Sequence, residues 1–369
     1  MSIFTDTEPD SPRRRRGAGW IGWSLLTVAT AAVVVVALLP SPYVVEQPGP
    51  AFDTLGTVTI DDEEVPLIDI PTETTYPTTG ALDMLTVSIV GNRDSPLTWF
   101  EAATAWLDKS KAVVPIDTIY PVGVTVEQSS EESRIQMEVS QQEAIAAALA
   151  HLDYDFDSTL TVEGFLDGSP ADGTIEVGDQ VVSLNGETFN YVSQMRAALA
   201  TNGIDKPATV VVIRDGKELS LEVTPVLSDE ATPAPVIGIL MSSEYEFPFD
   251  VTIQLENVGG PSAGQMFALG IIDKLTKGEL NGGQKVAGTG TITGEGQIGA
   301  IGGIRQKMYG ALGAGASYFL APASNCNEVT GHIPDGLTVL SVETLDDSLA
   351  ALDGIASGDV DGLPVCPVS

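Results

Sequence analysis

The chain of 369 residues has only two histidines and two cysteines, and it is short of cations. His151 and His332 lie in no recognisable catalytic motif, so histidine is a weak candidate for a general base. Lys and Arg number 17 against 51 Asp and Glu, which gives a net charge of −34. Such a surface repels nucleic acid and anionic lipid headgroups, so we expect no nucleic-acid partner. No acidic run is long enough to indicate a metal cage, so we predict neither a metal site nor a cofactor.

The composition still allows well-packed domains. Hydrophobic residues make up 43% of the chain, and the length leaves room for two or three domains. The 38 glycines and 23 prolines favour a loop-rich protein that is partly β. We therefore expect an α+β multidomain chain.

The longest uncharged run lies near the N-terminus. Arg13 to Arg16 precede it, and Trp20 to Leu39 contain no charged residue. At ~1.5 Å per residue, a helix of this length spans the ~30 Å hydrocarbon core of a bilayer. The pattern predicts a cytoplasmic tail over 1–19, a transmembrane helix over 20–39, and the rest of the chain outside the cytoplasm. A cleaved signal peptide is the alternative, although the small-residue site Ala29-Thr30-Ala31 lies inside the apolar run.

The region from 43 to 120 is predicted to be a β-rich juxtamembrane region that packs on the next part of the chain. It also contains a predicted helix over 97–108, with Trp99, Phe100, Ala103 and Leu107 on one face. Further along, Ser140 and Glu143 have the spacing of a capping box. They predict that a new helix starts at Ser140 and continues to Leu152.

Ser262 is placed at a predicted strand-to-helix turn. Apolar residues alternate with polar ones before it, at Val251, Ile253 and Leu255, and recur at helical spacing after it. Pro261 fits the first position of that helix. The free N–H groups of a first helical turn point where an anion can develop, and here they must come from Ser262, Ala263 or a neighbouring loop.

A second predicted helix carries Lys307. Ile304, Met308 and Ala311 form its apolar stripe, with Lys307 on the same stripe and Gly313 as the cap after it. Arg305 and Gln306 are predicted to point the other way. Burial lowers the pKa of a lysine, and a neutral amine can take the proton of a serine hydroxyl. The alternative is that Ser262 caps a helix and Lys307 extends to water.

Three motifs occur in order: Pro261-Ser262-Ala263-Gly264, then Gly288-Thr289-Gly290-Thr291-Ile292, then Gly296 to Gly303 with Lys307. Together they resemble the proteolytic domain of Lon-type serine peptidases, over 236–352. The resemblance implies that Ser262 is the nucleophile, that Lys307 is the base, and that Thr289 orients the lysine. Gly260 and Ala263 are expected to support the turn around Ser262. The family's ATPase module is missing, because no Gly-x4-Gly-Lys-Ser/Thr loop occurs, so we expect no ATP requirement.

The segment 121–227 resembles a PDZ domain of the bacterial protease type, with a helix before it. Gly168-Ser169-Pro170-Ala171 and Gly178-Asp179-Gln180-Val181 carry this resemblance. It implies that an extended peptide adds as a strand beside an exposed edge. The loop that would hold the peptide's carboxylate should precede the first core strand, and 152–156 is a poor candidate. A packing module beside the peptidase is therefore the alternative.

The whole order resembles the membrane-anchored, PDZ-containing Lon-like serine proteases of bacteria. It implies an ATP-independent serine endopeptidase at the cell membrane, with its catalytic domain outside the cytoplasm and protein or peptide substrates. By analogy with the family, a homo-oligomer is also expected. The alternative function is a PDZ-type scaffold with an inert peptidase-like domain. Residues 229–235 are predicted to be a linker and 353–369 a C-terminal tail. Because two cysteines in an oxidising compartment tend to pair, we expect a Cys326–Cys366 disulfide.

Overall fold

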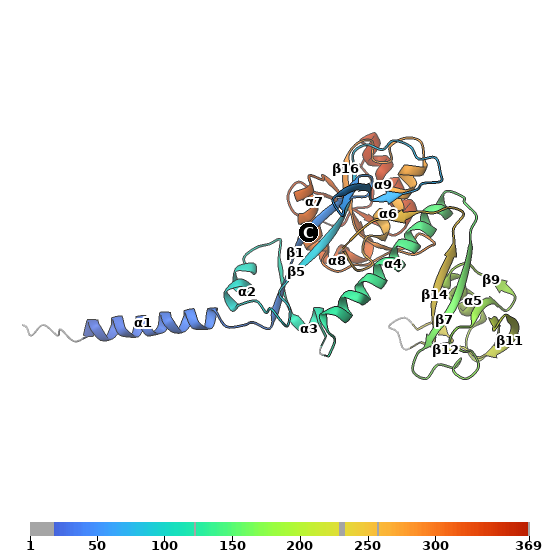
Figure 1. Cartoon of the computed structure of the whole chain (residues 1–369), viewed down its shortest axis with the longest axis horizontal. Helices are drawn as coiled ribbons and strands as arrows, with labels where there is room; N and C mark the ends of the chain where they lie inside the picture. Colours follow the sequence, from blue (N-terminus) through green and yellow to red (C-terminus); the bar gives the residue numbers. More distant parts are fainter. Residues whose placement is uncertain (1–17, 122, 229–232, 257, 368–369) are drawn as a thin grey trace, which may run out of the picture. The chain divides into compact units, whose positions relative to one another are not determined.

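The computed structural model describes residues 18–121, 123–228, 233–256 and 258–367 (Figure 1). The chain divides into two compact units, Met1–Gln47 with Ile89–Val126, and Pro48–Ser88 with Glu127–Ser369. Residues 1–17 of the predicted cytoplasmic tail and residues 229–232 of the predicted linker lie outside the described residues.

The first unit is small and is built around one strand pair. The start of β1 (Tyr43–Asp53) pairs antiparallel with β6 (Ala112–Pro115). Helix α2 (Trp99–Ala105) begins at Thr98, which forms a capping box with Glu101. Two further helices are α1 (Ala18–Ala37) and α3 (Ile116–Ile119).

Two predictions about this unit are wrong. Among the described residues, no helix is both long and apolar enough to cross a membrane. Helix α2 also differs from its prediction, because it ends at Ala105 and buries Ala102 and Ala105. Leu107 lies beyond the helix end and is 86% exposed.

A five-stranded antiparallel path forms the first sheet of the second unit. Its order is β11-β10-β8-β7-β14, and the short β9 pairs with β8. Alternate residues of β10, Val210 and Val212, are fully buried against helix α5 residues Met195 and Leu199. Strand β14 ends the sheet. The bounds are β7 (Asp157–Phe165), β8 (Gln180–Leu184), β9 (Glu187–Thr188), α5 (Val192–Asn202), β10 (Ala208–Arg214), β11 (Lys217–Val223) and β14 (Ile239–Glu246).

The second sheet of this unit has the order β20-β19-β16-β5-β1, and β5, β16, β19 and β20 run parallel. Neighbouring residues of β16 enter different cores: Val286 packs with helices α6 and α9, whereas Ala287 packs with helix α7. Such burial on both faces is typical of parallel sheets. The bounds are β5 (Ala81–Val90), α6 (Gly264–Leu275), β16 (Lys285–Gly288), α7 (Ile304–Ala314), β19 (Tyr318–Pro322), β20 (Thr338–Val342) and α9 (Leu345–Ser357).

Short pairs and turns complete the unit. They are β2 (Thr57–Ile60) with β3 (Glu63–Pro66), β4 (Ile68–Asp69) with β15 (Thr252–Ile253), β12 (Val226–Leu227) with β13 (Pro235–Val236), β17 (Thr291–Ile292) with β18 (Ile298–Gly299), the 3-10 turn η1 (Ala323–Asn325) and helix α8 (Cys326–Val329).

Helix α4 (Val126–His151) is one continuous helix of 26 residues. The predicted helix start at Ser140 is therefore wrong. The two side chains of the predicted capping box bond elsewhere, Ser140 to the carbonyl of Pro261 and Glu143 to the N–H of Gly294. The C-terminal half of α4 is buried in the same core as α6, through Ala144, Ala148 and their neighbours.

Candidate active site

Ser262 lies in a tight turn just before helix α6. Helix α6 begins at Gly264, three residues later than the prediction with Pro261 as its first residue. The carbonyls of Pro261 and Ser262 accept hydrogen bonds from groups outside helix α6. They therefore do not take part in the helix, which explains why it begins only at Gly264. The Ser262 carbonyl accepts from the N–H of Gly290 at 3.0 Å, and the N–H of Gln265 donates to the Gly290 carbonyl at 3.1 Å. These bonds leave Ser262 half-buried at the helix N-terminus.

Lys307 comes from helix α7, on the other face of the parallel sheet. Gly303 precedes this helix with φ +68, and a Cβ there would lie 2.7 Å from Val87 Cγ2. Only glycine suits a position with both constraints. The helix buries Ile304, Met308 and Ala311, and Lys307 with them, as the stripe predicts.

Two details of helix α7 differ from the prediction. The helix continues past Gly313 to Ala314, and Gly315 caps it with φ +85 and N–H bonds to the carbonyls of Ala311 and Leu312. Gln306 does not point to solvent, because it is 3% exposed. The buried face of helix α7 is therefore wider than its apolar stripe and includes Gln306. Arg305 does lie at the exposed side, where its Nε donates to the Glu328 carbonyl at 3.1 Å.

The structure brings Lys307 and Ser262 into hydrogen-bond contact. Lys307 Nζ lies 2.7 Å from Ser262 Oγ and 2.8 Å from Thr289 Oγ1. Thr289 comes directly after strand β16, and its hydroxyl donates to the Ser262 carbonyl at 2.9 Å. The three side chains therefore meet at the carboxyl end of β16, where helices from opposite faces of the sheet approach each other.

Burial sets the protonation state of Lys307. Lys307 is 2% exposed, and burial lowers the pKa of its amine from 10.5 to about 7. Desolvation alone has this effect because it disfavours the charged form. A carboxylate partner would favour the ammonium, and none contributes here. An amine with a pKa near neutrality can accept and return a proton at physiological pH.

Two main-chain N–H groups at the turn are available to a ligand. In the described part of the chain, the N–H groups of Ser262 and Ala263 donate to no other group. Ala263 is the N-cap residue of α6 and is buried, and Gly260 donates its own N–H to the Ser133 carbonyl at 2.8 Å. Free N–H groups at a helix N-terminus attract negative charge. The described residues contain no group of three or more His, Cys, Asp or Glu that could hold a metal ion.

The loop that leads to Lys307 is held by Asn325, which no sequence pattern singles out. The N–H of Ile301 donates to Asn325 Oδ1 at 2.9 Å, and Asn325 Nδ2 donates to the Ile301 carbonyl at 2.9 Å. Asn325 is 1% exposed, so both bonds are shielded from water. A polar residue between the apolar strand β19 and helix α8 is the only sequence signal of this role.

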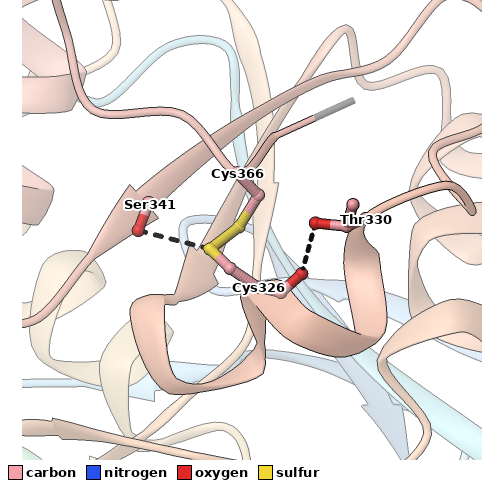
Figure 2. Close-up of a disulfide and its surroundings, with 4 residues drawn as sticks. All are labelled: Cys326, Thr330, Ser341 and Cys366. Carbon is pink, nitrogen blue, oxygen red and sulfur yellow. Dashed lines mark hydrogen bonds between the residues drawn. A yellow bond between two sulfur atoms is a disulfide. The ribbon is translucent and has the colours of Figure 1, made fainter. Parts of the chain in front are cut away.

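Cys326, the next residue, forms a disulfide with Cys366 (Figure 2). The Ser341 hydroxyl lies 3.4 Å from Cys326 Sγ, and Thr330 Oγ1 donates to the Cys326 carbonyl at 2.9 Å. Figure 2 marks both contacts with dashed lines. The C-terminal segment also pairs with strand β20 through a bridge between Val365 and Leu340. The disulfide thus ties this segment to the turn that carries Asn325.

Two segments of the chain match known protein families. Residues 257–353 match the family described as Lon protease (S16) C-terminal proteolytic domain. Residues 123–224 match the PDZ domain family. The chain carries a Lon-type proteolytic domain and a PDZ domain. Both Ser262 and Lys307 lie within the first match, and the Lon-type domain supports a serine peptidase.

The similar proteins are much longer than the part that matches. A Lon protease of Geobacter metallireducens is 37% identical over 94 residues, which are 25% of this chain and 11% of that protein. Lon protease 2 of Herpetosiphon aurantiacus is 32% identical over 166 residues, 41% of this chain and 20% of that protein. The PDZ domain of an SdrC-like protein of Listeria innocua is 18% identical, over 22% of this chain and 92% of that one, with a TM-score of 0.21, too low to bear on the fold.

Proposed function

We propose that this chain is a serine endopeptidase that uses Ser262 as nucleophile and Lys307 as general base. The observation that carries the proposal is the 2.7 Å contact between Lys307 Nζ and Ser262 Oγ, made by a lysine that is 2% exposed. A solvated lysine is protonated at neutral pH and cannot accept a proton. The burial of Lys307 removes that obstacle, so the pair has both the geometry and the protonation state that the reaction needs.

In the first half of the reaction, Ser262 Oγ attacks the carbon of the scissile carbonyl and its proton passes to Lys307 Nζ. The negative charge that forms on the carbonyl oxygen is stabilised by the N–H groups of Ser262 and Ala263. The intermediate then collapses, the C–N bond breaks, and the Lys307 ammonium gives its proton to the leaving amine. An ester between Ser262 and the acyl half of the substrate remains.

In the second half, a water molecule attacks the ester carbonyl while Lys307 Nζ takes one of its protons. The C–O bond to Ser262 breaks, and the proton returns from Lys307 to Ser262 Oγ. The products are a carboxylic acid and the starting enzyme. Thr289 supports both halves, because its hydroxyl donates to the Ser262 carbonyl and can therefore accept a hydrogen bond from Lys307 Nζ.

We further propose that cleavage needs no ATP and takes place in an oxidising compartment outside the cytoplasm. The sequence has no Gly-x4-Gly-Lys-Ser/Thr loop, which supports the first point. The Cys326–Cys366 disulfide supports the second, because disulfides persist in oxidising surroundings. Without coupled unfolding, the substrates would be unfolded segments, loops or tails of proteins.

We propose that the PDZ domain presents extended peptide segments to the protease. Strand β14 is at the end of its sheet, so one of its edges can take a further strand. The segment 152–156 is a poor candidate for a carboxylate loop, because the N–H groups of Leu152, Asp153 and Tyr154 donate to carbonyls of helix α4. A peptide library with free and amidated C-termini would test whether binding needs a carboxylate.

A fluorophosphonate probe, which reacts with activated serines, tests the proposed function. We expect the probe to label the parent protein at Ser262 and the parent to cut an unstructured peptide without ATP. Ser262→Ala and Lys307→Met should do neither. Ser317→Ala, which changes an exposed serine, is the matched control and should behave like the parent. An unlabelled, inactive parent would favour the alternative function, a PDZ-type scaffold with an inert peptidase-like domain.

A further inference from the structure

Helix α4 (green in Figure 1) touches the turn around Ser262 through two residues, Ser133 and Ser140. Their separation of two helical turns places both on one face of the helix. The Ser133 carbonyl accepts from the N–H of Gly260 at 2.8 Å, and Ser140 Oγ donates to the Pro261 carbonyl at 2.9 Å. The approach is close: a Cβ on Gly259 would lie 2.7 Å from Ser133 Cβ.

The hydrogen bond from Ser140 acts on the peptide group that joins Pro261 to Ser262. In a trans peptide the carbonyl and the N–H point in opposite directions, so a bond that holds the Pro261 carbonyl also aims the N–H of Ser262. The next peptide group is held in the same way, because the Ser262 carbonyl accepts from the N–H of Gly290 and from Thr289 Oγ1. Both backbone dihedrals of Ser262 are therefore fixed, and so is the start of its side chain.

Ser140 itself has little freedom. It is 3% exposed and lies between Met137 and Ala144, which are buried in the core shared with helix α6. A serine hydroxyl in such a place needs a partner, and the Pro261 carbonyl is the partner it has. The same helix also reaches the loop after β17, where Glu143 accepts from the N–H of Gly294. Helix α4 thus contacts both the turn before Ser262 and the loop after β17.

We propose that Ser140 is a positioning residue for the proposed reaction: it orients the peptide group before Ser262, and with it the nucleophile and one oxyanion donor. The inference rests on the proposed role of Ser262 as nucleophile. Helix α4 lies outside the residues 257–353 that match the proteolytic domain. The site is then completed by a segment outside the match to the proteolytic domain.

The test compares Ser140→Ala with Ser133→Ala in the full chain. Both changes remove a hydroxyl from the same face of α4, but Ser133 holds the turn through its main-chain carbonyl, which alanine keeps. We expect Ser140→Ala to lower kcat about 10- to 100-fold, as small misplacements of reacting groups do. KM should stay unchanged, and so should the pH at which the rate reaches half its maximum as Lys307 loses its proton. Probe labelling of Ser262 should slow by a factor similar to that of kcat. Ser133→Ala should match the parent in all four measurements.

Two further variants cover the case in which Ser140→Ala does not fold. Ser140→Thr keeps the hydroxyl and should retain most of kcat, whereas Ser140→Cys keeps the size but is a weak donor and should lose most of it. If Ser140→Ala or Ser140→Cys folds and has the kcat of Ser133→Ala, the positioning role is wrong while the proposed function stands. If the parent neither cleaves the peptide nor reacts with the probe, the proposed function is wrong, and the role of Ser140 fails with it.

Discussion

Thr289 Oγ1 lies 2.8 Å from Lys307 Nζ while its own proton goes to the Ser262 carbonyl. The threonine oxygen is therefore an acceptor toward the lysine, and a neutral amine that donates to it can turn its lone pair toward Ser262 Oγ. We expect Thr289→Val, which is nearly isosteric, to lower kcat about tenfold or more, since one oriented hydrogen bond of ~1.4 kcal/mol is worth that factor. Thr289→Ser should keep most of the activity. Equal kcat values for the Val and Ser variants would contradict this role.

The pH dependence of peptide cleavage should report the Lys307 amine. Burial lowers its pKa to about 7, so the neutral base is scarce below that pH and predominates above it. The rate should therefore rise with pH along one limb and level off above neutrality. The measurement is kcat/KM against pH for an uncharged peptide, with the Ser133→Ala variant as a control for folding. A limb centred near the ordinary lysine value of 10.5 would show that Lys307 is solvated in the working enzyme.

Lys307→Arg should be inactive at every pH in the stable range. A guanidinium does not deprotonate in proteins, so it keeps the charge of a protonated lysine and cannot act as a base. Arg305→Lys is the matched control, because it exchanges the same two residue types at an exposed position of the same helix. Substantial activity of Lys307→Arg at neutral pH would rule out the proposed mechanism.

The same burial predicts a stability cost. The folded-state pKa of Lys307 is lowered to about 7 while the unfolded value is near 10.5, so the unfolded state binds the extra proton between these values. The free energy of unfolding should then rise with pH from about 7 to 10, and Lys307 should destabilise the fold at lower pH. Lys307→Met, uncharged and similar in length, should raise the free energy of unfolding by ~2–4 kcal/mol at pH 6. Urea titrations of both proteins at pH 6 and pH 9.5 measure this, and a difference that does not shrink at pH 9.5 would contradict it.

The sequence singled out Ser262 and Lys307, which the structure brings into contact, but not the residues that support them. Ser262 and Lys307 stand out because each sits in a pattern of its own, a turn between periodic segments and an apolar helical stripe. Ser140 and Asn325 do not, because their partners, Pro261 and Ile301, are distant in the sequence and their roles depend on tertiary contacts. The capping-box spacing at Ser140 was misleading for the same reason: the side chains bond to other loops, and the helix runs through.

The disulfide should matter for stability more than for the first step of catalysis. In the chain-entropy model, a closed loop of about 40 residues stabilises by ~3–4 kcal/mol, and Cys326 and Cys366 are 40 residues apart. The double variant Cys326→Ser/Cys366→Ser should therefore lose roughly that free energy of unfolding. Reductant should lower the melting temperature of the parent and leave that of the double variant unchanged. A reductant effect on both proteins would point to another cause.

Asn325 links that disulfide to the base. Its amide pairs with both polar groups of Ile301, and the chain continues through Gly302 and Gly303 into the helix of Lys307. Asn325→Asp keeps the shape and the acceptor, but it loses the donor to the Ile301 carbonyl and buries a charge. We expect the free energy of unfolding to fall by ~2–4 kcal/mol. We also expect kcat to fall, because the segment that leads to Lys307 loses one of the two hydrogen bonds that fix it.

The matched control for Asn325→Asp is Asn327→Asp, the same change at an exposed residue of the next turn, which should be neutral. KM separates positioning of the base from substrate binding, since a displaced Lys307 weakens the reaction step and leaves binding intact. Asn325→Asp should therefore lower kcat with KM unchanged, measured where both proteins are fully folded. A rise in KM at constant kcat would place Asn325 beside the substrate instead.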